Sequence, residues 1–268
     1  MPPLLRLIHP APAVAVVALA AALAAILGAG AGPWRIALVV VAVGGSQVVT
    51  GALNDWADRG RDAASGQDKP IPAGLVTPAA ALRLAVAGAI VQLAASVPLG
   101  AGFVLLGAVA TMSAVAYDLW LSRTPLSVLP YLVSFGTLPL WVATGVGAPP
   151  ERVLGAVPLA AAFAGAAHLA NALRDWETDA ASGSRSLVQV LGRQRSRVLA
   201  SGVSLAVGIG VGASLLVGGR VTPGVAGGGL IGLAAVGAGA ISERWLWRGQ
   251  LVAAVAWTVA WALSGAGT

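Results

Sequence analysis

The most restrictive feature of this sequence is a succession of apolar runs, each of about 20 residues. Because an α-helix rises about 1.5 Å per residue, a run of this length crosses the ~30 Å hydrocarbon core of a bilayer. The sequence therefore predicts an all-α, multi-pass membrane bundle of about nine transmembrane helices around a central cavity. The predicted spans are residues 11–31, 36–54, 79–98, 101–121, 127–146, 153–173, 198–218, 223–242 and 249–266.

Composition agrees with a membrane protein. With 57% hydrophobic and 10% charged residues and a mean hydropathy of +0.85, the 268 residues carry more apolar surface than one water-soluble core can bury. The first apolar run follows a basic residue, as in a secretory signal, but its length and the many similar runs favour a first spanning helix. Cysteine is absent, which excludes a thiolate nucleophile and disulfides.

The basic residues predict the orientation of the chain in the membrane. If the N-terminus faces the cytoplasm, only Arg35, Arg152 and Arg220 of the 16 basic residues lie on the opposite side. The positive-inside rule then places the remaining loops in the cytoplasm, and we expect the protein to lie in the cell membrane. Every acidic residue except Glu151 falls on that same side. The charge is spread over short loops, so we expect contact with the lipid bilayer and none with nucleic acid.

A polar motif occurs twice, as "NDWADRGRDAASG" at residues 54–66 and "NALRDWETDAASG" at residues 171–183. Each follows an even-numbered predicted span. Residues at i, i+4 and i+8 lie along one helix face with a drift of only about 40° per step, so each copy forms a polar stripe if its helix continues past the membrane surface. The predicted stripes are Asn54, Asp58 and Asp62 in the first copy and Asn171, Asp175 and Asp179 in the second.

These stripes offer carboxylate and amide oxygens, with Asp55 as an additional carboxylate, and such hard donors suit Mg²⁺. Lys69, Arg174 and Arg185 lie beside them in the sequence. A diphosphate is the ligand that best satisfies both the metal and these cations. The alternative is a pair of solvated loops with helix caps, which is disfavoured because a chain with only 10 acidic residues repeats the motif.

At these residues the sequence resembles the UbiA superfamily of intramembrane prenyltransferases. The family motif Asn-Asp-x-x-Asp-x-x-x-Asp matches residues 54–62, and "KPIPAG" at 69–74 is similar to its Arg-Pro-[Ile/Leu]-x-x-Gly, with Lys69 in place of Arg. The second motif, "NALRDWETDAASGSRSLVQVLG", is most similar to the menaquinone-pathway branch. The resemblance covers the whole helical frame, which implies one domain over residues 1–268 with motif 1 at 54–74 and motif 2 at 171–192.

The resemblance implies a Mg²⁺-dependent transfer of a prenyl group from an allylic prenyl diphosphate donor to an aromatic or lipid acceptor. Tyr117 stands at the position of a family tyrosine, and Arg123 takes the diphosphate contact because Ser122 replaces an expected lysine. Asp58, Asp175 and Tyr117 are the expected catalytic residues. The expected diphosphate ligands are Lys69, Arg123, Arg174 and Arg185, and the expected metal ligands are Asn54, Asp55, Asp58, Asp62, Asn171, Asp175 and Asp179.

Three alternatives stay open from the sequence. They are a membrane terpene cyclase, an enzyme that transfers another diphosphate-activated group such as phosphoribose to a polyprenyl phosphate, and a cation-coupled transporter. The transporter is disfavoured because a transporter is expected to place its acidic residues at mid-bilayer depth, whereas the acidic residues of this chain cluster at one face of the membrane. Three further polar residues are interpreted structurally: His9 as an interfacial side chain, Asp118 as a helix-end acid and His168 as a satisfied buried histidine.

Overall fold

The computed structural model describes residues 1–66, 68–241 and 243–265, and the regular secondary structure of these residues is entirely helical, as predicted. The chain divides into two compact units. Unit 1 consists of Met1–Ser122 and Leu140–Pro149, and unit 2 of Arg123–Pro139 and Pro150–Thr268. The single domain over residues 1–268 stays a prediction.

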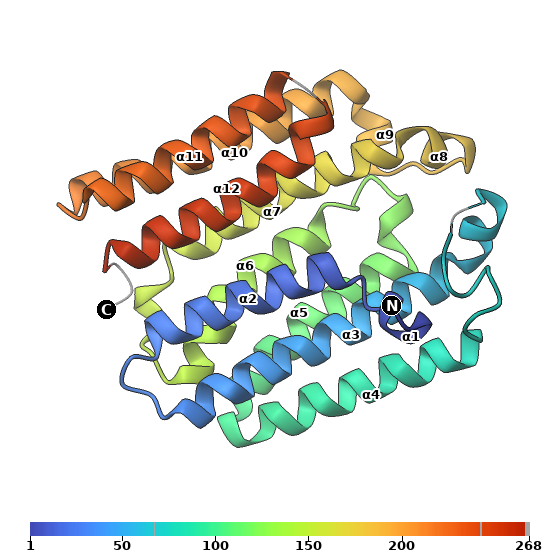
Figure 1. Cartoon of the computed structure of the whole chain (residues 1–268), viewed down its shortest axis with the longest axis horizontal. Helices are drawn as coiled ribbons and strands as arrows, with labels where there is room; N and C mark the ends of the chain where they lie inside the picture. Colours follow the sequence, from blue (N-terminus) through green and yellow to red (C-terminus); the bar gives the residue numbers. More distant parts are fainter. Residues whose placement is uncertain (67, 242, 266–268) are drawn as a thin grey trace. The chain divides into compact units, whose positions relative to one another are not determined.

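Unit 1 is built around one long helix. Helix α3 packs against α2, α4 and α5, and Figure 1 shows it in light blue. Helices α2, α3 and α4 each begin with proline, whose fixed φ suits the first turn and whose missing N–H is not needed there. The helices of this unit are α1 (Pro3–Arg6), α2 (Pro10–Leu27), α3 (Pro33–Ala64), α4 (Pro78–Ser96), η1 (Val97–Leu99), α5 (Ala101–Leu119) and η2 (Leu121–Arg123), the last at the unit boundary.

Unit 2 contains the remaining helices. Helix α6 belongs partly to each unit, because the boundary between the units follows Pro139, a proline inside this helix. Helix α7 packs against α10, and α11 packs against α12. The elements are α6 (Leu129–Val146), η3 (Pro150–Arg152), α7 (Ala156–Ala172), η4 (Leu173–Asp175), α8 (Trp176–Ala181), α9 (Leu187–Leu191), α10 (Arg193–Val217), α11 (Pro223–Ile241) and α12 (Glu243–Leu263).

Buried polar contacts join neighbouring helices within each unit. In unit 1, Thr111 of α5 donates a hydrogen bond to the side chain of Gln92 of α4 over 3.1 Å. In unit 2, the fully buried Ser204 of α10 donates to the side chain of Gln250 of α12 over 2.8 Å. Interhelical hydrogen bonds of this kind contribute about 1 kcal/mol each in membrane proteins.

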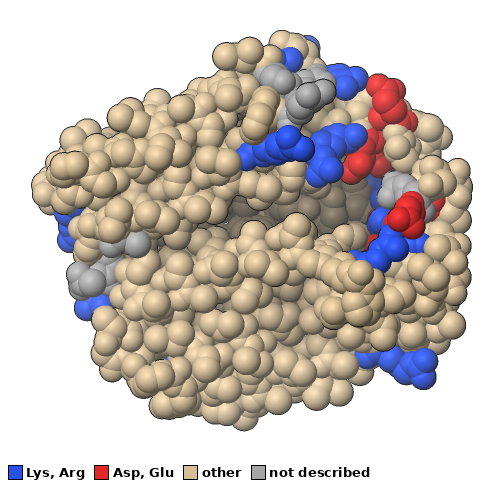
Figure 2. Space-filling view, viewed as in Figure 1, with Lys and Arg blue, Asp and Glu red and all other residues tan. Residues whose placement is uncertain are grey.

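Each of the predicted spans corresponds to a long helix over its described residues, and only positions 242 and 266 of the predicted spans lie outside that part of the chain. Seven of the described helices are long and apolar enough to cross a membrane. The apolar part of α11, Pro223–Gly239, is shorter than the other spans. The total of nine crossings therefore stays a prediction. On the face shown in Figure 2 most of the surface is uncharged, as expected for helices surrounded by lipid. The seven candidate spans are Pro10–Leu27, Pro33–Ala64, Pro78–Leu99, Ala101–Leu119, Leu129–Val146, Ala156–Ala181 and Arg193–Val217.

Candidate active site

Motif 1 lies on one uninterrupted helix. As the spacing predicts, α3 continues past Asn54 through Asp58 and Asp62, and it ends at Ala64. Asp58 is 4% exposed and Asp62 only 1%. Asp55, which the spacing places off the stripe, is also buried. Buried carboxylates are unfavourable unless cations or hydrogen-bond donors compensate them, so their partners decide what this cluster can bind.

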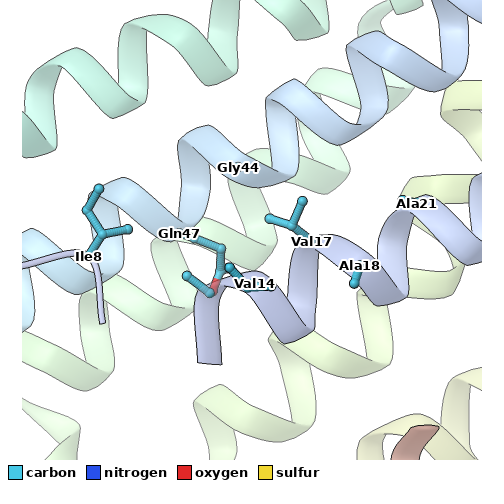
Figure 3. Close-up of a pocket in the computed structure, with 8 residues that line it drawn as sticks. Ile8, Val14, Val17, Ala18, Ala21, Gly44 and Gln47 are labelled. Atoms are coloured by element: carbon cyan, nitrogen blue, oxygen red, sulfur yellow. The ribbon is translucent and has the colours of Figure 1, made fainter. Parts of the chain in front are cut away.

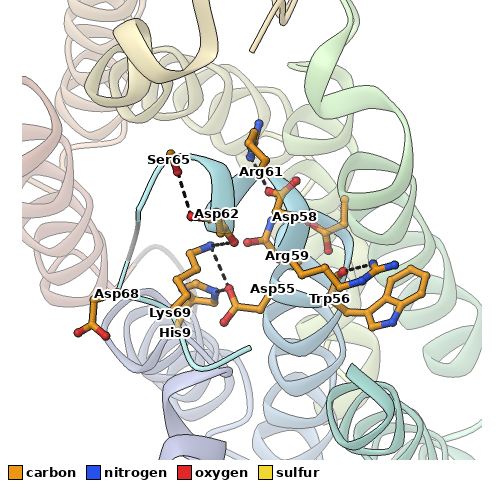
Figure 4. Close-up of polar contacts among 12 residues, drawn as sticks. His9, Asp55, Trp56, Asp58, Arg59, Arg61, Asp62, Ser65, Asp68 and Lys69 are labelled. Carbon is orange, nitrogen blue, oxygen red and sulfur yellow. Dashed lines mark hydrogen bonds and ion pairs between the residues drawn. The ribbon is translucent and has the colours of Figure 1, made fainter. Parts of the chain in front are cut away.

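Lys69 is the central cation of this cluster (Figure 4). Its Nζ lies 3.0 Å from Oδ1 of Asp55 and 3.0 Å from Oδ2 of Asp62. Burial lowers the pKa of Lys69, but the carboxylates of Asp55 and Asp62 outweigh this effect and raise the pKa above its usual value. The ammonium group therefore stays charged at neutral pH and joins two acids of motif 1.

The segment "KPIPAG" holds Lys69 in place through a compact turn. The N–H of Leu75 donates to the carbonyl of Pro70 over 3.0 Å, and Gly74 has a φ of +70°, which favours glycine. Ile71 is buried in a small apolar cluster with Leu7, Val76 and Ala81. Burial of this side chain anchors the turn next to α3 and directs Lys69 towards the aspartates.

Arg61 provides a second cation within motif 1. Its NH2 atom lies 2.5 Å from Oδ2 of Asp58, three residues earlier on α3. The neighbouring Arg59 instead donates to the backbone carbonyl of Trp56 and lies over the ring of that residue (Figure 4). The acids of motif 1 are thus paired by Lys69 and Arg61, although sequence reasoning did not assign Arg61 to the site.

His9 is a member of the cluster that the sequence interpretation missed. Its Nε2 lies 3.0 Å from Oδ1 of Asp55, and its φ of 50° is in the left-handed region that is uncommon outside glycine. The preceding backbone approaches α3 closely, because a Cβ added to Gly51 would lie 2.7 Å from the carbonyl oxygen of Leu7. No local pattern predicts this contact, since 46 positions separate His9 from Asp55.

Asp118 of α5 also joins motif 1. The Nδ2 of Asn54 donates a hydrogen bond to its Oδ1 over 3.1 Å, and Asp118 is only 8% exposed. Its Oδ2 is buried and has no hydrogen-bond partner among the residues that the structure describes. The interpretation of Asp118 as an ordinary helix-end acid therefore understated its place in the site. Tyr117, the preceding residue on α5, is half-buried.

The predicted stripe of motif 2 is wrong in its geometry. Helix α7 ends at Ala172, a 3₁₀ turn covers Leu173–Asp175, and α8 begins at Trp176. A 3₁₀ helix has about 3.0 residues per turn rather than about 3.6, so residues on either side of this turn do not share one α-helical face. Asn171 and Asp179 are half-buried, whereas Asp175 is exposed as the N-terminal flanking residue of α8.

The predicted anion-binding arginines of unit 2 lie around this segment. Arg174 donates to Oδ1 of Asn171 over 3.3 Å. The backbone N–H of Arg185 donates to the backbone carbonyl of Arg123 over 3.1 Å, and both side chains are exposed. Unit 2 therefore brings together the backbones of two residues that the sequence places in separate loops.

An apolar hollow lies along α2 and α3 within unit 1 (Figure 3). Its volume is about 340 Å³, and Gln47 is a polar side chain in a lining made mainly of small and branched apolar residues. Such a surface accommodates hydrocarbon rather than charged groups. The lining residues are Ile8, Ala13, Val14, Val17, Ala18, Ala21, Gly44 and Gln47.

The donor atoms of motif 1 fit Mg²⁺ chemically, since they are carboxylate and amide oxygens. Beside them, Oδ2 of Asp118 on α5 is buried without a hydrogen bond from the described residues. Within those same residues, no three His, Asp or Glu side chains are already grouped as a metal site. The ion pairs formed by Lys69 and Arg61 occupy the carboxylates. Metal binding therefore requires these pairs to rearrange.

Comparisons with solved structures show the same fold. A UbiA homolog from Archaeoglobus fulgidus bound to GPP and Mg²⁺ matches with a TM-score of 0.73 and 16% identity, covering 97% of this chain and 98% of that chain. The apo structure of a UbiA homolog from Aeropyrum pernix K1 matches with a TM-score of 0.71 and 18% identity, covering 94% of this chain and 96% of that one. Both likenesses show that this chain shares the helical fold of UbiA homologs.

The family follows from sequence comparison. The model of the UbiA prenyltransferase family matches residues 13–250. A digeranylgeranylglyceryl phosphate synthase from Natronomonas pharaonis is 30% identical over 201 residues, which cover 74% of this chain and 72% of that protein. The chain belongs to the UbiA prenyltransferase family and is an integral, multi-pass membrane enzyme. The transporter alternative does not fit this family.

Proposed function

We propose that this enzyme transfers a prenyl group from an allylic prenyl diphosphate to an aromatic or lipid acceptor, with Mg²⁺ as its cofactor. The observation that carries the proposal is the buried acid cluster of unit 1. Asp55, Asp58, Asp62 and Asp118 are all at most 8% exposed, and Lys69 and Arg61 form ion pairs with the first three of them in the described part of the chain. A further cation would stabilise such a cluster, and an anionic substrate could accompany it.

Both copies of the motif contribute to metal binding in this proposal. When bound, Mg²⁺ would neutralise charge on the diphosphate and make it a better leaving group. The Mg²⁺ complex of the Archaeoglobus fulgidus homolog with GPP supports this cofactor and this class of donor. The proposed metal ligands are Asn54, Asp55, Asp58, Asp62, Asn171, Asp175 and Asp179.

In this proposal four basic residues, named below, bind the diphosphate, and the ring of Tyr117 faces the reacting carbon of the prenyl donor. The carbon–oxygen bond of the donor breaks, and its electron pair leaves with the diphosphate. The allylic cation that remains forms a bond to the nucleophilic acceptor, which then loses a proton. The ring face of Tyr117 stabilises the cation by about 1–2 kcal/mol in a site that excludes water. The proposed diphosphate ligands are Lys69, Arg123, Arg174 and Arg185.

The curated relative is named for a prenylated glyceryl phosphate, so a glyceryl phosphate lipid belongs among the candidate acceptors. The menaquinone-pathway branch stays a prediction from the second motif. The location in the cell membrane with the motif loops in the cytoplasm stays a prediction from the distribution of basic residues.

The decisive experiment incubates the purified enzyme and Mg²⁺ with allylic diphosphates of graded chain length, first without an acceptor and then with aromatic and glyceryl phosphate lipid acceptors. Diphosphate release and products are followed by mass spectrometry. We expect prenylated acceptor and little release without it. Cyclic hydrocarbons formed in the absence of an acceptor would instead establish the terpene cyclase. A parallel incubation supplies a phosphoribosyl diphosphate and a polyprenyl phosphate, and turnover in that incubation alone would establish the other transferase.

A further inference from the structure

A buried serine and a buried histidine form a pair in unit 2 that the catalytic proposal does not use. Ser127 precedes α6 and is 0% exposed, and His168 of α7 is 1% exposed. The Oγ of Ser127 lies 3.1 Å from Nε2 of His168. Burial of a hydroxyl and an imidazole is unfavourable unless they form hydrogen bonds. The contact between Ser127 and His168 therefore compensates for the burial of both side chains.

The same hydroxyl also holds the tail of motif 2. The backbone N–H of Leu187 donates to Oγ of Ser127 over 3.1 Å. Two residues earlier, the N–H of Arg185 donates to the carbonyl of Arg123 over 3.1 Å. The segment after α5 and the tail of motif 2 are therefore joined at two points, and one of these points depends on Ser127.

Packing fixes the histidine that supports this serine. The imidazole of His168 lies against the ring of Tyr131, with 4.5 Å between ring centroids. His168 is also three residues before Asn171 on α7, and the buried Leu169 belongs to an apolar cluster that includes Val188 of the motif 2 tail. Three segments that carry proposed site residues thus meet at the Ser127–His168 pair: α7, the loop of Arg123 and the loop of Arg185.

We propose that Ser127 and His168 are positioning residues that hold Arg123 and Arg185 in register for the leaving diphosphate, an inference that rests on the function proposed above. A backbone that is already fixed presents both arginines to the substrate without reordering the two segments when the substrate arrives. Donors that are oriented in advance need no reorganisation when charge develops on the leaving group.

The first test replaces the hydroxyl and uses a matched control. Ser127→Ala removes the acceptor for Leu187, and Ser127→Thr retains a hydroxyl. Ser204→Ala is the control, because Ser204 is also 0% exposed in unit 2 and donates to Gln250 over 2.8 Å. We expect Ser127→Ala to raise the KM of the prenyl diphosphate and the inhibition constant of inorganic diphosphate about tenfold, the size of one lost hydrogen bond. Ser127→Thr should recover most of this loss, whereas Ser204→Ala should lower the melting temperature without changing either constant.

A second variant tests the pair independently of the serine. His168→Phe keeps a ring against Tyr131 but lacks the nitrogen that contacts Ser127. It should raise the same two constants, and its combination with Ser127→Ala should be little worse than either single change, because both act through one contact. If Ser127→Ala does not yield folded protein, His168→Phe decides the question.

The variants Arg123→Gln and Arg185→Gln distinguish a failure of the positioning role from a failure of the proposed diphosphate binding. If both raise the KM of the donor while Ser127→Ala and His168→Phe behave like Ser204→Ala, the positioning role is wrong and the proposed function stands. If neither arginine variant changes the KM of the donor or the inhibition by inorganic diphosphate, the diphosphate role of these arginines is wrong, and the positioning role is wrong with it.

Discussion

The side-chain amide of Asn54 donates a hydrogen bond to Oδ1 of Asp118 over 3.1 Å, although 64 positions separate the two residues. Because the amide nitrogen is committed to Asp118, the amide oxygen of Asn54 is directed away from that acid. An oxygen oriented in this way is available to a cation, and carboxylates commonly orient metal ligands by such outer contacts. The pair therefore makes α5 part of a site that the sequence places on α3.

This contact predicts different effects for two substitutions of Asp118. Asp118→Ala removes the acceptor and should lower kcat/KM about tenfold, as is usual for outer-shell partners of metal ligands. Asp118→Asn retains an oxygen that can accept from Asn54 and should be milder. Glu151→Ala, in the exposed turn η3, is the control and should have no effect. Equal losses in both Asp118 variants would show that its charge, and not its orientation of Asn54, is what matters.

The doubled motif predicts that Asp58 and Asp175 act as one unit. Asp58→Asn and Asp175→Asn preserve shape but remove a charge that Mg²⁺ and diphosphate require, so each should lower kcat while the protein stays folded. The double variant should be little worse than either single variant, as for other groups that share one task. Steady-state kinetics and circular dichroism test this. Near-normal turnover of Asp175→Asn beside an inactive Asp58→Asn would limit the second motif to a structural role.

Lys69 should be required for stability chiefly when metal is absent. Lys69→Gln leaves Asp55 and Asp62 without their shared cation and should lower the free energy of unfolding by about 3 kcal/mol, the effect of breaking a buried ion pair. Mg²⁺ should recover part of this loss, because it can compensate the same carboxylates. Lys69→Arg should be mild, and Arg59→Gln, which changes an exposed cation of the same region, is the control. Thermal unfolding with and without Mg²⁺ measures the difference; an equal loss in both conditions would argue against metal binding here.

Metal removal should abolish turnover. Since the proposed ligands are carboxylate and amide oxygens, EDTA should inactivate the enzyme and Mg²⁺ should restore it, with Mn²⁺ as a substitute. The measurement is diphosphate release across a chelation series, with calorimetric titration of Mg²⁺ into the metal-free protein as a readout without substrate. Activity that survives thorough chelation would remove the metal from the mechanism.

The predicted orientation can be tested because the chain contains no cysteine. Ser65 and Glu151 are both exposed, so single substitutions Ser65→Cys and Glu151→Cys present reactive thiols. A membrane-impermeant reagent applied to intact cells should label Glu151→Cys only, and Ser65→Cys should react after the cells are opened. Labelling of both variants in intact cells would refute the predicted topology.

Sequence alone determined the class of fold and the residues of the first motif. Apolar runs of helical length have one main outcome in a bilayer, where backbone groups must be satisfied within each segment. The spacing of Asn54, Asp58 and Asp62 requires only the local geometry of one helix, and α3 provides it. Lys69 was identified from the motif that contains it, while its pairing with Asp55 and Asp62 became visible only in the structure.

Tertiary structure decided the contacts that join separate helices. His9 with Asp55, Asn54 with Asp118 and Ser127 with His168 each connect distant parts of the chain. Periodicity describes one helix at a time, so it carries no information on which face of a neighbour a side chain meets. It also failed at residues 173–175, where a 3₁₀ turn replaces the α-helix that the spacing assumes. Local pattern thus predicts which residues share a helix, whereas packing between helices determines which of them form a site.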